Sequence, residues 1–265
     1  MKLLPPSLIL SAALVLLGTA PQVFAQDAAP SADTPAQAEA AQKAQQNPSD
    51  TMLNTSAPCV RFSHCIQETL GHKDPVDKVL YSTHALKYWT DELPLRDLVN
   101  ALKLRSEALI DLHIVQVSSD TVSKVGFDPL AYAEEDYQKF LSFYPKHWLP
   151  LSGLARIAEL RNDMKTARGY YWQSIQTNQV RAWRNLADFH FRTKEWQSAV
   201  NDLTAALKKD DELMLRKINI EPAERAQIYA QRAEAYTQLA QRQKAYEDQQ
   251  AACQLDSTNE FCAAN

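Results

Sequence analysis

Residues 183–211 read WRNLADFHFRTKEWQSAVNDLTAALKKDD, and this stretch points to the fold class. Large, medium and small apolar residues recur in it at helical spacing, in two successive runs. The side chains that would face inward are Trp183, Leu186, Ala187, His190, Ala199, Leu203 and Ala206. The small Ala199 falls where the two helices would touch most closely. The stretch therefore predicts a pair of helices packed against each other.

The same pattern recurs on both sides of this stretch. A single amphipathic pair of helices could match it by chance, but such a chance match would not recur. Downstream it falls on Tyr229, Ala233, Tyr236, Ala245, Ala252 and Ser257. Upstream it falls on Leu151, Leu154, Ala155, Ala158, Ala167, Tyr171 and Ser174. Still earlier, a lone second helix is indicated by Ala133, Tyr137, Phe140 and Pro145.

Over about residues 129–262 the chain resembles the tetratricopeptide repeat (TPR) family, whose period is about 34 residues. The resemblance implies a right-handed α-solenoid of helical hairpins. The step from Trp183 to Tyr229 is about twelve residues longer than that period, which is close to three helical turns. We therefore expect 212–219 to prolong the second helix of the middle unit, before Glu221-Pro222 opens the next helix.

Residues 58–128 are expected to form an N-terminal helical cap on residues 129–265, which hold the repeats and a C-terminal cap. Asp74 before Pro75 starts one helix, and Pro94 separates it from a second. Apolar residues recur at helical spacing in both: Val76, Val79, Leu80, Leu86, Leu98, Leu102, Leu109 and Leu112. Residues 118–127 have the composition of a loop, and Asp128-Pro129 starts the next helix. The fold is thus predicted to be all-α.

The N-terminus has the features of an export signal. Lys2 precedes an apolar run over 8–17, and Val23-Phe24-Ala25 suits signal peptidase, so 1–25 are interpreted as a signal peptide. The run is short for a membrane anchor, which is the weaker alternative. Residues 26–57 are rich in Ala, Gln and Pro and are expected to be a disordered tether. We expect a periplasmic protein without stable membrane insertion; secretion is the alternative.

The four cysteines all lie after the expected cleavage site, and an exported chain favours disulfides. Three pairings are formally possible, and the local one is favoured: Cys59 with Cys65, and Cys253 with Cys262. A zinc site of these first two cysteines with His64 and His72 is the alternative, but the spacing matches no recognised pattern. No metal and no cofactor is therefore expected.

A net charge of −4 argues against general binding of nucleic acids. The TPR resemblance implies that the concave groove is lined by first-helix residues that do not pack internally. Carried over, the groove residues are Arg156, Arg181, Arg184, Asn185, Asp188, Arg192 and Gln231, with Phe191 as a further candidate. These arginines would suit a carboxylate. They would equally suit a solvated face paired with Asp188, Glu159 and Glu234, and the sequence leaves both readings open.

Catalysis has no compact signature in the sequence. The runs Glu134-Glu135-Asp136 and Asp210-Asp211-Glu212 are interpreted as solvated helix ends, His190 as a structural histidine, and the aromatic residues around Trp172 mostly as core. The predicted function is a non-catalytic adaptor that binds a peptide or flexible segment of another cell-envelope protein, in envelope assembly or in the regulation of peptidoglycan synthesis. A secreted factor acting on other cells and a hydrolase with TPR-like helices are the alternatives.

Overall fold

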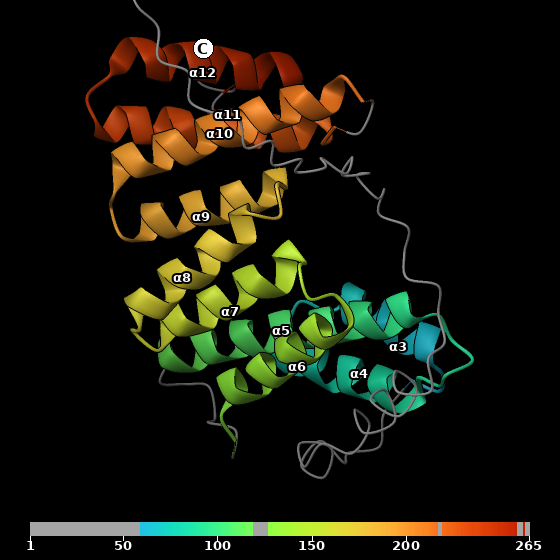
Figure 1. Cartoon of the computed structure of the whole chain (residues 1–265). Helices are drawn as coiled ribbons and strands as arrows, with labels where there is room; N and C mark the ends of the chain where they lie inside the picture. The colour runs from blue at the N-terminus through green and yellow to red at the C-terminus, as the bar shows by residue number, and fades with distance from the viewer. Residues whose placement is uncertain (1–58, 119–126, 217–218, 259–261, 263–265) are drawn as a thin grey trace, which may run out of the picture. The chain divides into compact units, whose positions relative to one another are not determined.

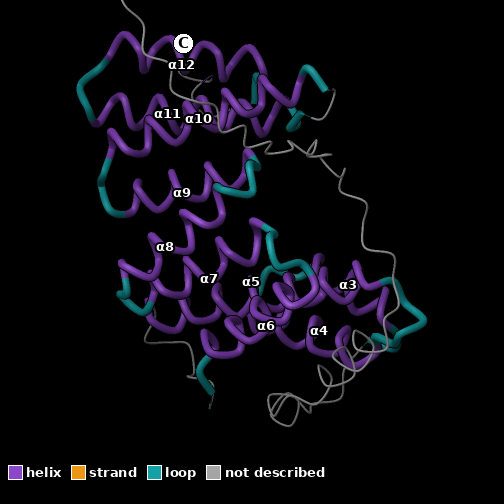
Figure 2. The backbone as a smooth tube through the Cα atoms, in the orientation of Figure 1, coloured by secondary structure: helices purple, strands orange, loops and turns teal. Residues whose placement is uncertain are grey.

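The computed structural model describes residues 59–118, 127–216, 219–258 and 262, which all belong to the unit Thr34–Asn265. The expected signal peptide and tether lie outside these residues, as does 119–126 of the expected loop. Within the described ranges the chain consists of helices and loops, and no strand is present (Figure 2). The helices are α3 (Phe62–Gly71), α4 (Pro75–Tyr88), α5 (Leu95–Ser118), α6 (Pro129–Phe143), α7 (Trp148–Leu160), α8 (Met164–Ile175), α9 (Val180–Arg192), α10 (Trp196–Met214), α11 (Pro222–Gln238) and α12 (Arg242–Leu255).

Each helix packs against its neighbours in the chain, so the helices form successive antiparallel pairs (Figure 1). The pairs α7–α8, α9–α10 and α11–α12 correspond to the three units expected from the sequence. The small inward positions are buried as predicted, because Ala155, Ala187, Ala199 and Ala233 have no exposed surface. Small residues at these contacts let the paired helices approach closely. The larger predicted residues Trp183, Leu186 and Tyr229 are only partly buried, and Ser257 is exposed. The all-α fold of stacked helical hairpins is confirmed.

The three hairpins also share one turn geometry. Each turn contains a residue at positive φ, namely Asn162, Lys194 or Ala240. In each, a backbone N–H reaches back five residues to a helical carbonyl, from Asp163 to Ala158, from Glu195 to His190 and from Gln241 to Tyr236. This is the hydrogen-bond pattern of a Schellman motif, which satisfies the last carbonyls of the first helix. Glycine is the usual residue there, and none of the three is a glycine, so these turns were not predicted.

Two aspartates cap helices as predicted. The Asp74 side chain accepts from the N–H of Val76 at 2.8 Å, and the Asp128 side chain accepts from the N–H of Leu130 at 2.9 Å. In both helices proline occupies the first helical position, where its missing N–H costs no hydrogen bond. The starts of α4 and α6 are thus set by local sequence.

The N-terminal helices bury most of the apolar residues expected to face inward. Leu98, Leu102, Leu109 and Leu112 of α5 are all at most 2% exposed. Val76 and Leu80 are exceptions, because Val76 is 44% exposed and Leu80 is only partly buried. α5 pairs with α6, so a domain boundary at residue 129 would fall between the two helices of one hairpin.

The predicted extension of the middle unit is wrong beyond Met214. α10 ends there, and the N–H of Ile220 instead donates to the buried Asp210 carboxylate at 3.0 Å. Ile220 thus contacts α10, and α11 begins at Pro222 as expected.

Both local disulfides are present, Cys59–Cys65 and Cys253–Cys262. Cys59 and Cys65 lie in an apolar cluster with Leu86, Trp89 and Phe140, so this bridge is part of the N-terminal core. Because both thiols are oxidised, they are not thiolate ligands for zinc. His64 and His72 instead both lie beside Glu68, at 3.4 and 3.3 Å. None of the helices in the described ranges combines the length and apolar character needed to span a membrane.

Candidate functional site

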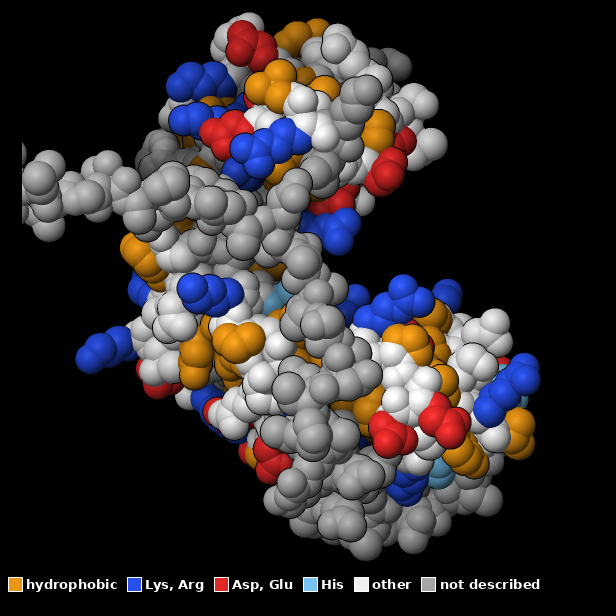
Figure 3. Space-filling model, turned by 45° about the vertical axis from the view of Figure 1, so that its right-hand side comes forward, with side chains coloured by type: hydrophobic (Ala, Val, Ile, Leu, Met, Phe, Trp, Pro, Cys, Tyr) orange, Lys and Arg blue, Asp and Glu red, His pale blue; other side chains and the backbone are white. Residues whose placement is uncertain are grey.

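A cavity of about 490 Å³ opens among alternate helices of the stack. Its walls come mainly from α5, α7 and α9, with Tyr137 of α6, Tyr171 of α8 and Glu224 of α11 at its edges. These alternate helices are the first members of their hairpins, which is where the TPR resemblance places a groove. Figure 3 shows Lys and Arg side chains on both sides of a hollow in the face that it presents. The volume is within the range of clefts that bind small ligands or short segments.

Most of the predicted groove residues come together here. The cavity is lined by six of them: Arg156, Arg181, Arg184, Asn185, Asp188 and Arg192. Gln231 lies just behind the lining, because its Nε2 donates to Asp188 Oδ1 at 3.0 Å. Phe191 is not part of the lining; its ring packs edge-on against Trp196, with the centroids 5.6 Å apart. Phe191 therefore contributes to packing between α9 and α10.

Three of the four arginines are held by carboxylates of the protein. Arg181 donates two hydrogen bonds to Glu224, both at 2.8 Å, and these lower the pKa of that carboxyl group. Arg192 binds Glu159 through two hydrogen bonds of 2.6 and 2.9 Å, and Arg156 binds the same carboxylate at 2.7 Å. Glu159 was among the predicted partners and Glu224 was not, so the reading of a paired arginine face named the correct partner for Arg156 and Arg192 but not for Arg181.

Arg184 and Asn185 differ from these three arginines in their hydrogen bonding. Among the described residues, Arg184 makes no ion pair or hydrogen bond, and its interactions with Asp188 and Glu224 are electrostatic at longer range. The Asn185 side chain likewise makes no hydrogen bond within that part of the chain. Both side chains are half-buried on α9 and line the cavity. Five guanidinium N–H groups and an amide that can donate or accept are thus available to a ligand.

Asp188 sets the charge beside these two residues. Partial burial raises the pKa of its carboxyl group, while Arg184 and Arg192 act in the opposite direction. The amide of Gln231 donates to the carboxylate from α11, and the Oε1 of the same amide is buried without a hydrogen-bond partner in the described structure. Asp188 is therefore the acidic element within an otherwise basic wall.

The opposite wall contains acidic residues that the sequence did not indicate as part of a site. Glu107 and Asp111 lie one helical turn apart on α5 and both line the cavity. Lys103 Nζ is 3.9 Å from Glu107 Oε2, at the limit of an ion pair. These residues were missed because α5 was assigned to a cap rather than to the repeats. The spacing of two carboxylates on one face of α5 was the only available signal.

A glycine shapes the cavity floor. A Cβ added at Gly153 of α7 would lie 2.2 Å from the Tyr137 ring, so the glycine allows this buried ring to pack directly on the helix backbone. Next to it, the Ser152 and Ser174 hydroxyls are 2.8 Å apart and join α7 to α8. The floor is therefore made of fixed, closely packed groups.

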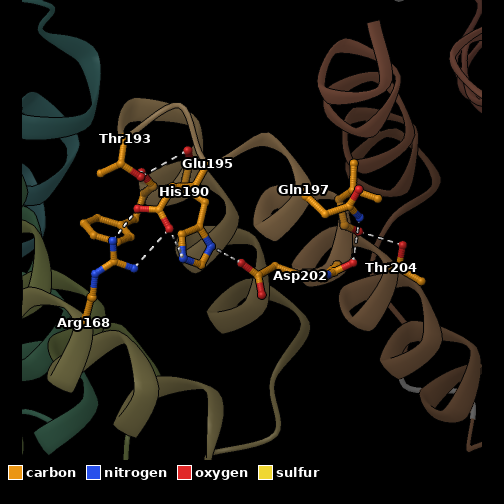
Figure 4. A network of polar contacts seen from close by, with 10 residues as sticks. Arg168, His190, Thr193, Glu195, Gln197, Asp202 and Thr204 are labelled. Atoms are coloured by element: carbon orange, nitrogen blue, oxygen red, sulfur yellow. Dashed lines mark hydrogen bonds and ion pairs between the residues drawn. The ribbon is translucent and has the colours of Figure 1, made fainter. Parts of the chain in front are cut away.

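His190 lies outside the cavity in a polar network between α8, α9 and α10 (Figure 4). Its Nδ1 contacts Asp202, and its Nε2 is 3.8 Å from Glu195, which in turn binds Arg168. The histidine and Asp202 are both 11% exposed. The network ties three helices together. Among the described residues, no group of three or more His, Cys, Asp or Glu side chains is placed to hold a metal ion.

Some charged and aromatic residues differ from expectation. Asp136 and Asp210, interpreted as solvated, are 2% and 0% exposed. Trp172, expected in the core, is 59% exposed on α8, whereas its neighbour Tyr171 is 2% exposed. The reason is one of register, because neighbouring positions on a helix point about 100° apart and only one of these two faces α7.

The described part of the chain has a TPR-like fold. This follows from the helical pairs, their repeated turn and the cavity between alternate helices. No protein-family model matches the sequence, and no curated protein matches it significantly.

Three solved structures share similarity with the chain at low sequence identity. The MamA protein is 12% identical with a TM-score of 0.41, covering 74% of this chain and 92% of MamA. YrrB, titled a TPR protein with an unusual peptide-binding site, is 12% identical with a TM-score of 0.42, covering 85% of this chain and 97% of YrrB. BtubC from P. vanneervenii is 15% identical with a TM-score of 0.49, covering 85% and 92%.

Proposed function

We propose that the protein is a non-catalytic adaptor that binds a peptide or flexible segment of another protein in the cavity, with a carboxylate held by Arg184 and Asn185. The observation that carries the proposal is the presence of these two polar side chains, without partners in the described structure, in a wall whose other arginines are neutralised. A guanidinium forms two parallel hydrogen bonds with a carboxylate, and the amide of Asn185 adds a third donor. Charge-assisted hydrogen bonds of this kind contribute about 1.5–3 kcal/mol.

The neighbouring ion pairs support the same proposal by fixing the wall. Arg156 and Arg192 both bind Glu159 of α7, and Arg181 binds Glu224 of α11, so α9 is restrained on both sides. A ligand would then meet a preformed surface, which lowers the entropic cost of binding. Asp188 favours ligands that bring hydrogen-bond donors beside their carboxylate, as the backbone N–H groups of a peptide do.

The binding proposal is tested with Arg184→Glu. The probe is a fluorescein-labelled hexapeptide of glycine, serine and alanine with one norleucine and a free carboxyl terminus. Fluorescence polarisation is expected to show at least a tenfold loss of affinity, because about 1.4 kcal/mol corresponds to a factor of ten. The thermal midpoint should change little, since Arg184 makes no ion pair in the described structure.

Arg242→Glu is the matched control, because it makes the same change of charge on the exposed face of α12. It should leave the affinity unchanged, and amidation of the peptide carboxyl group should weaken binding to the unchanged protein. Equal affinities of the wild type and Arg184→Glu for the free-carboxyl peptide would remove Arg184 from the explanation.

We further propose that the protein acts in the cell envelope, in its assembly or in the regulation of peptidoglycan synthesis. Two disulfides support a location outside the reducing cytoplasm, and the N-terminal sequence has the features of an export signal. Fractionation of cells should find the chain among proteins released by osmotic shock, with its N-terminus near Gln26 by mass spectrometry. Recovery from the medium would favour a secreted factor, and a cytoplasmic chain that retains Met1 would contradict export.

A further inference from the structure

The acidic wall of the cavity has no role in carboxylate binding. Among the described residues, Asp111 makes no ion pair or hydrogen bond, and Lys78 acts on it only at longer range. Glu107 has only the 3.9 Å contact with Lys103. The pKa of Glu107 is raised, chiefly because neighbouring groups remove part of its water; Lys103 and Lys78 act in the opposite direction, and the nearby Asp111 adds to the rise. Two exposed carboxylates that repel each other therefore face the cavity, and Lys103 is the one cation in contact with them among the described residues.

The two charged walls lie on opposite sides of one helix. α7 contacts both α5 and α9, so it separates Glu107 and Asp111 from Arg184 and Asn185. Between the walls, α7 contributes mainly small and apolar groups, namely Trp148, Leu149, Ser152 and Gly153. It also contributes Arg156, whose charge is paired with Glu159. The cavity thus has a negative wall, a neutral floor and a wall with a free positive charge.

We propose that the cavity selects an extended peptide that carries a basic side chain upstream of a carboxylate, with the basic group at Glu107 and Asp111 and the carboxylate at Arg184 and Asn185. This inference rests on the proposed function for its carboxylate end and adds the specificity at the other end. A ligand with one charge would leave the opposite wall uncompensated. A purely acidic peptide would in addition be repelled by the α5 wall.

The spacing of the helices gives the spacing of the two charges. Packed helices lie about 8–10 Å apart, so the axes of α5 and α9 are separated by roughly 16–20 Å across α7. Side chains from both walls reach inward by several Å, which leaves about 10 Å. An extended chain covers this distance with about three residues, at about 3.3 Å per residue. The basic residue is therefore placed three positions before the carboxyl-terminal residue.

The test compares three labelled hexapeptides that differ only at that position. One carries lysine, one norleucine and one glutamate, and all have the same glycine, serine and alanine background and a free carboxyl terminus. With the disulfide-bonded protein at low ionic strength, fluorescence polarisation should rank them lysine, norleucine, glutamate. We expect the affinities of successive peptides in this order to differ by about five- to tenfold. Salt at about 0.5 M should reduce these differences, because screening weakens partly exposed charge pairs.

The double variant Glu107→Gln/Asp111→Asn assigns this preference to the α5 wall. It should bring the affinities for the lysine and norleucine peptides within twofold while leaving the norleucine peptide unchanged. Asp91→Asn/Glu92→Gln is the matched control: it makes the same change of net charge at exposed positions between α4 and α5 that do not line the cavity. It should preserve the full preference for lysine.

The outcomes separate this inference from the proposed function. Suppose that binding of the norleucine peptide is weakened by Arg184→Glu, but the lysine peptide binds no more tightly than the norleucine peptide. The proposed specificity is then wrong and the carboxylate site stands. The same conclusion follows if the preference for lysine survives in the α5 double variant. If lysine alone drives binding and Arg184→Glu has no effect, the carboxylate site is wrong. Absence of binding by the lysine peptide at millimolar concentration would overturn the inference as well.

Discussion

Replacing Arg105 with methionine is expected to lower the free energy of unfolding by about 3–5 kcal/mol. Arg105 of α5 donates to Asp136 of α6 through Nε at 2.8 Å and Nη2 at 2.6 Å, and their side chains are 5% and 3% exposed. The substitution would leave a buried carboxylate without its guanidinium, and removing one partner of a buried pair costs more than the pair contributes. Chemical unfolding followed by circular dichroism measures the loss.

Two further variants identify the cause of that loss. Arg105→Met/Asp136→Leu should recover most of the stability, because replacing both buried charges by apolar groups removes the uncompensated carboxylate. Arg161→Met removes a cation from the more exposed pair with Glu134, whose side chains are 40% and 32% exposed, and should cost less than about 1 kcal/mol. A single Arg105→Met variant as stable as the wild type would show that the buried pair does not hold α5 to α6.

Replacing Asp210 with alanine is expected to lower the free energy of unfolding by roughly 2–4 kcal/mol. The Asp210 carboxylate is fully buried, accepts from the N–H of Ile220 at 3.0 Å and binds Arg225 at the start of α11. Its loss would leave the Ile220 N–H without this acceptor and would release the connection between α10 and α11. Hydrogen exchange should therefore increase first at 219–225, while the thermal midpoint falls.

The neighbouring aspartate provides the control for this second variant. Asp211 also accepts from Arg225, at 2.7 Å, but its side chain is 61% exposed. Because exposed pairs contribute about 0–1 kcal/mol, Asp211→Ala should be nearly neutral. Equal effects of the two substitutions would mean that the charge of Arg225, rather than the buried acceptor for Ile220, governs the connection.

The burial of Asp136 and Asp210 could not be predicted from the local sequence pattern. Asp136 and Asp210 each belong to an acidic run near a helix end, and such runs are ordinarily solvated. The partner of Asp136 is 31 positions away and that of Asp210 is 15 positions away, so neither pair has a signature in the sequence around it. The end of α10 was mispredicted for the same reason, since the acceptor for Ile220 belongs to the preceding helix.

The candidate site also contains some residues that could be predicted from the sequence and others that could not. Arg184 and Asn185 could be placed from the TPR resemblance, because their position within α9 follows from the packing positions around them. The pairing of Arg192 with Glu159 was one of the two readings that the sequence left open. The pairing of Arg181 with Glu224 was not predicted, because Glu224 belongs to another helix. Glu107 and Asp111 were not predicted, since nothing in α5 shows that it takes the place of a first helix.

The sequence alone determined the all-α class, the small inward positions of the repeats and the capped starts of α4 and α6, and it favoured the local disulfide pairing. Each of these depends on residues within a few turns of one another, where helical period and side-chain size are sufficient. Only the tertiary structure decided which charges are buried, which arginines remain available and which two walls face each other across α7. Those properties depend on the distances between side chains of helices that lie far apart in the chain. The energy of a charge in a protein depends strongly on such distances.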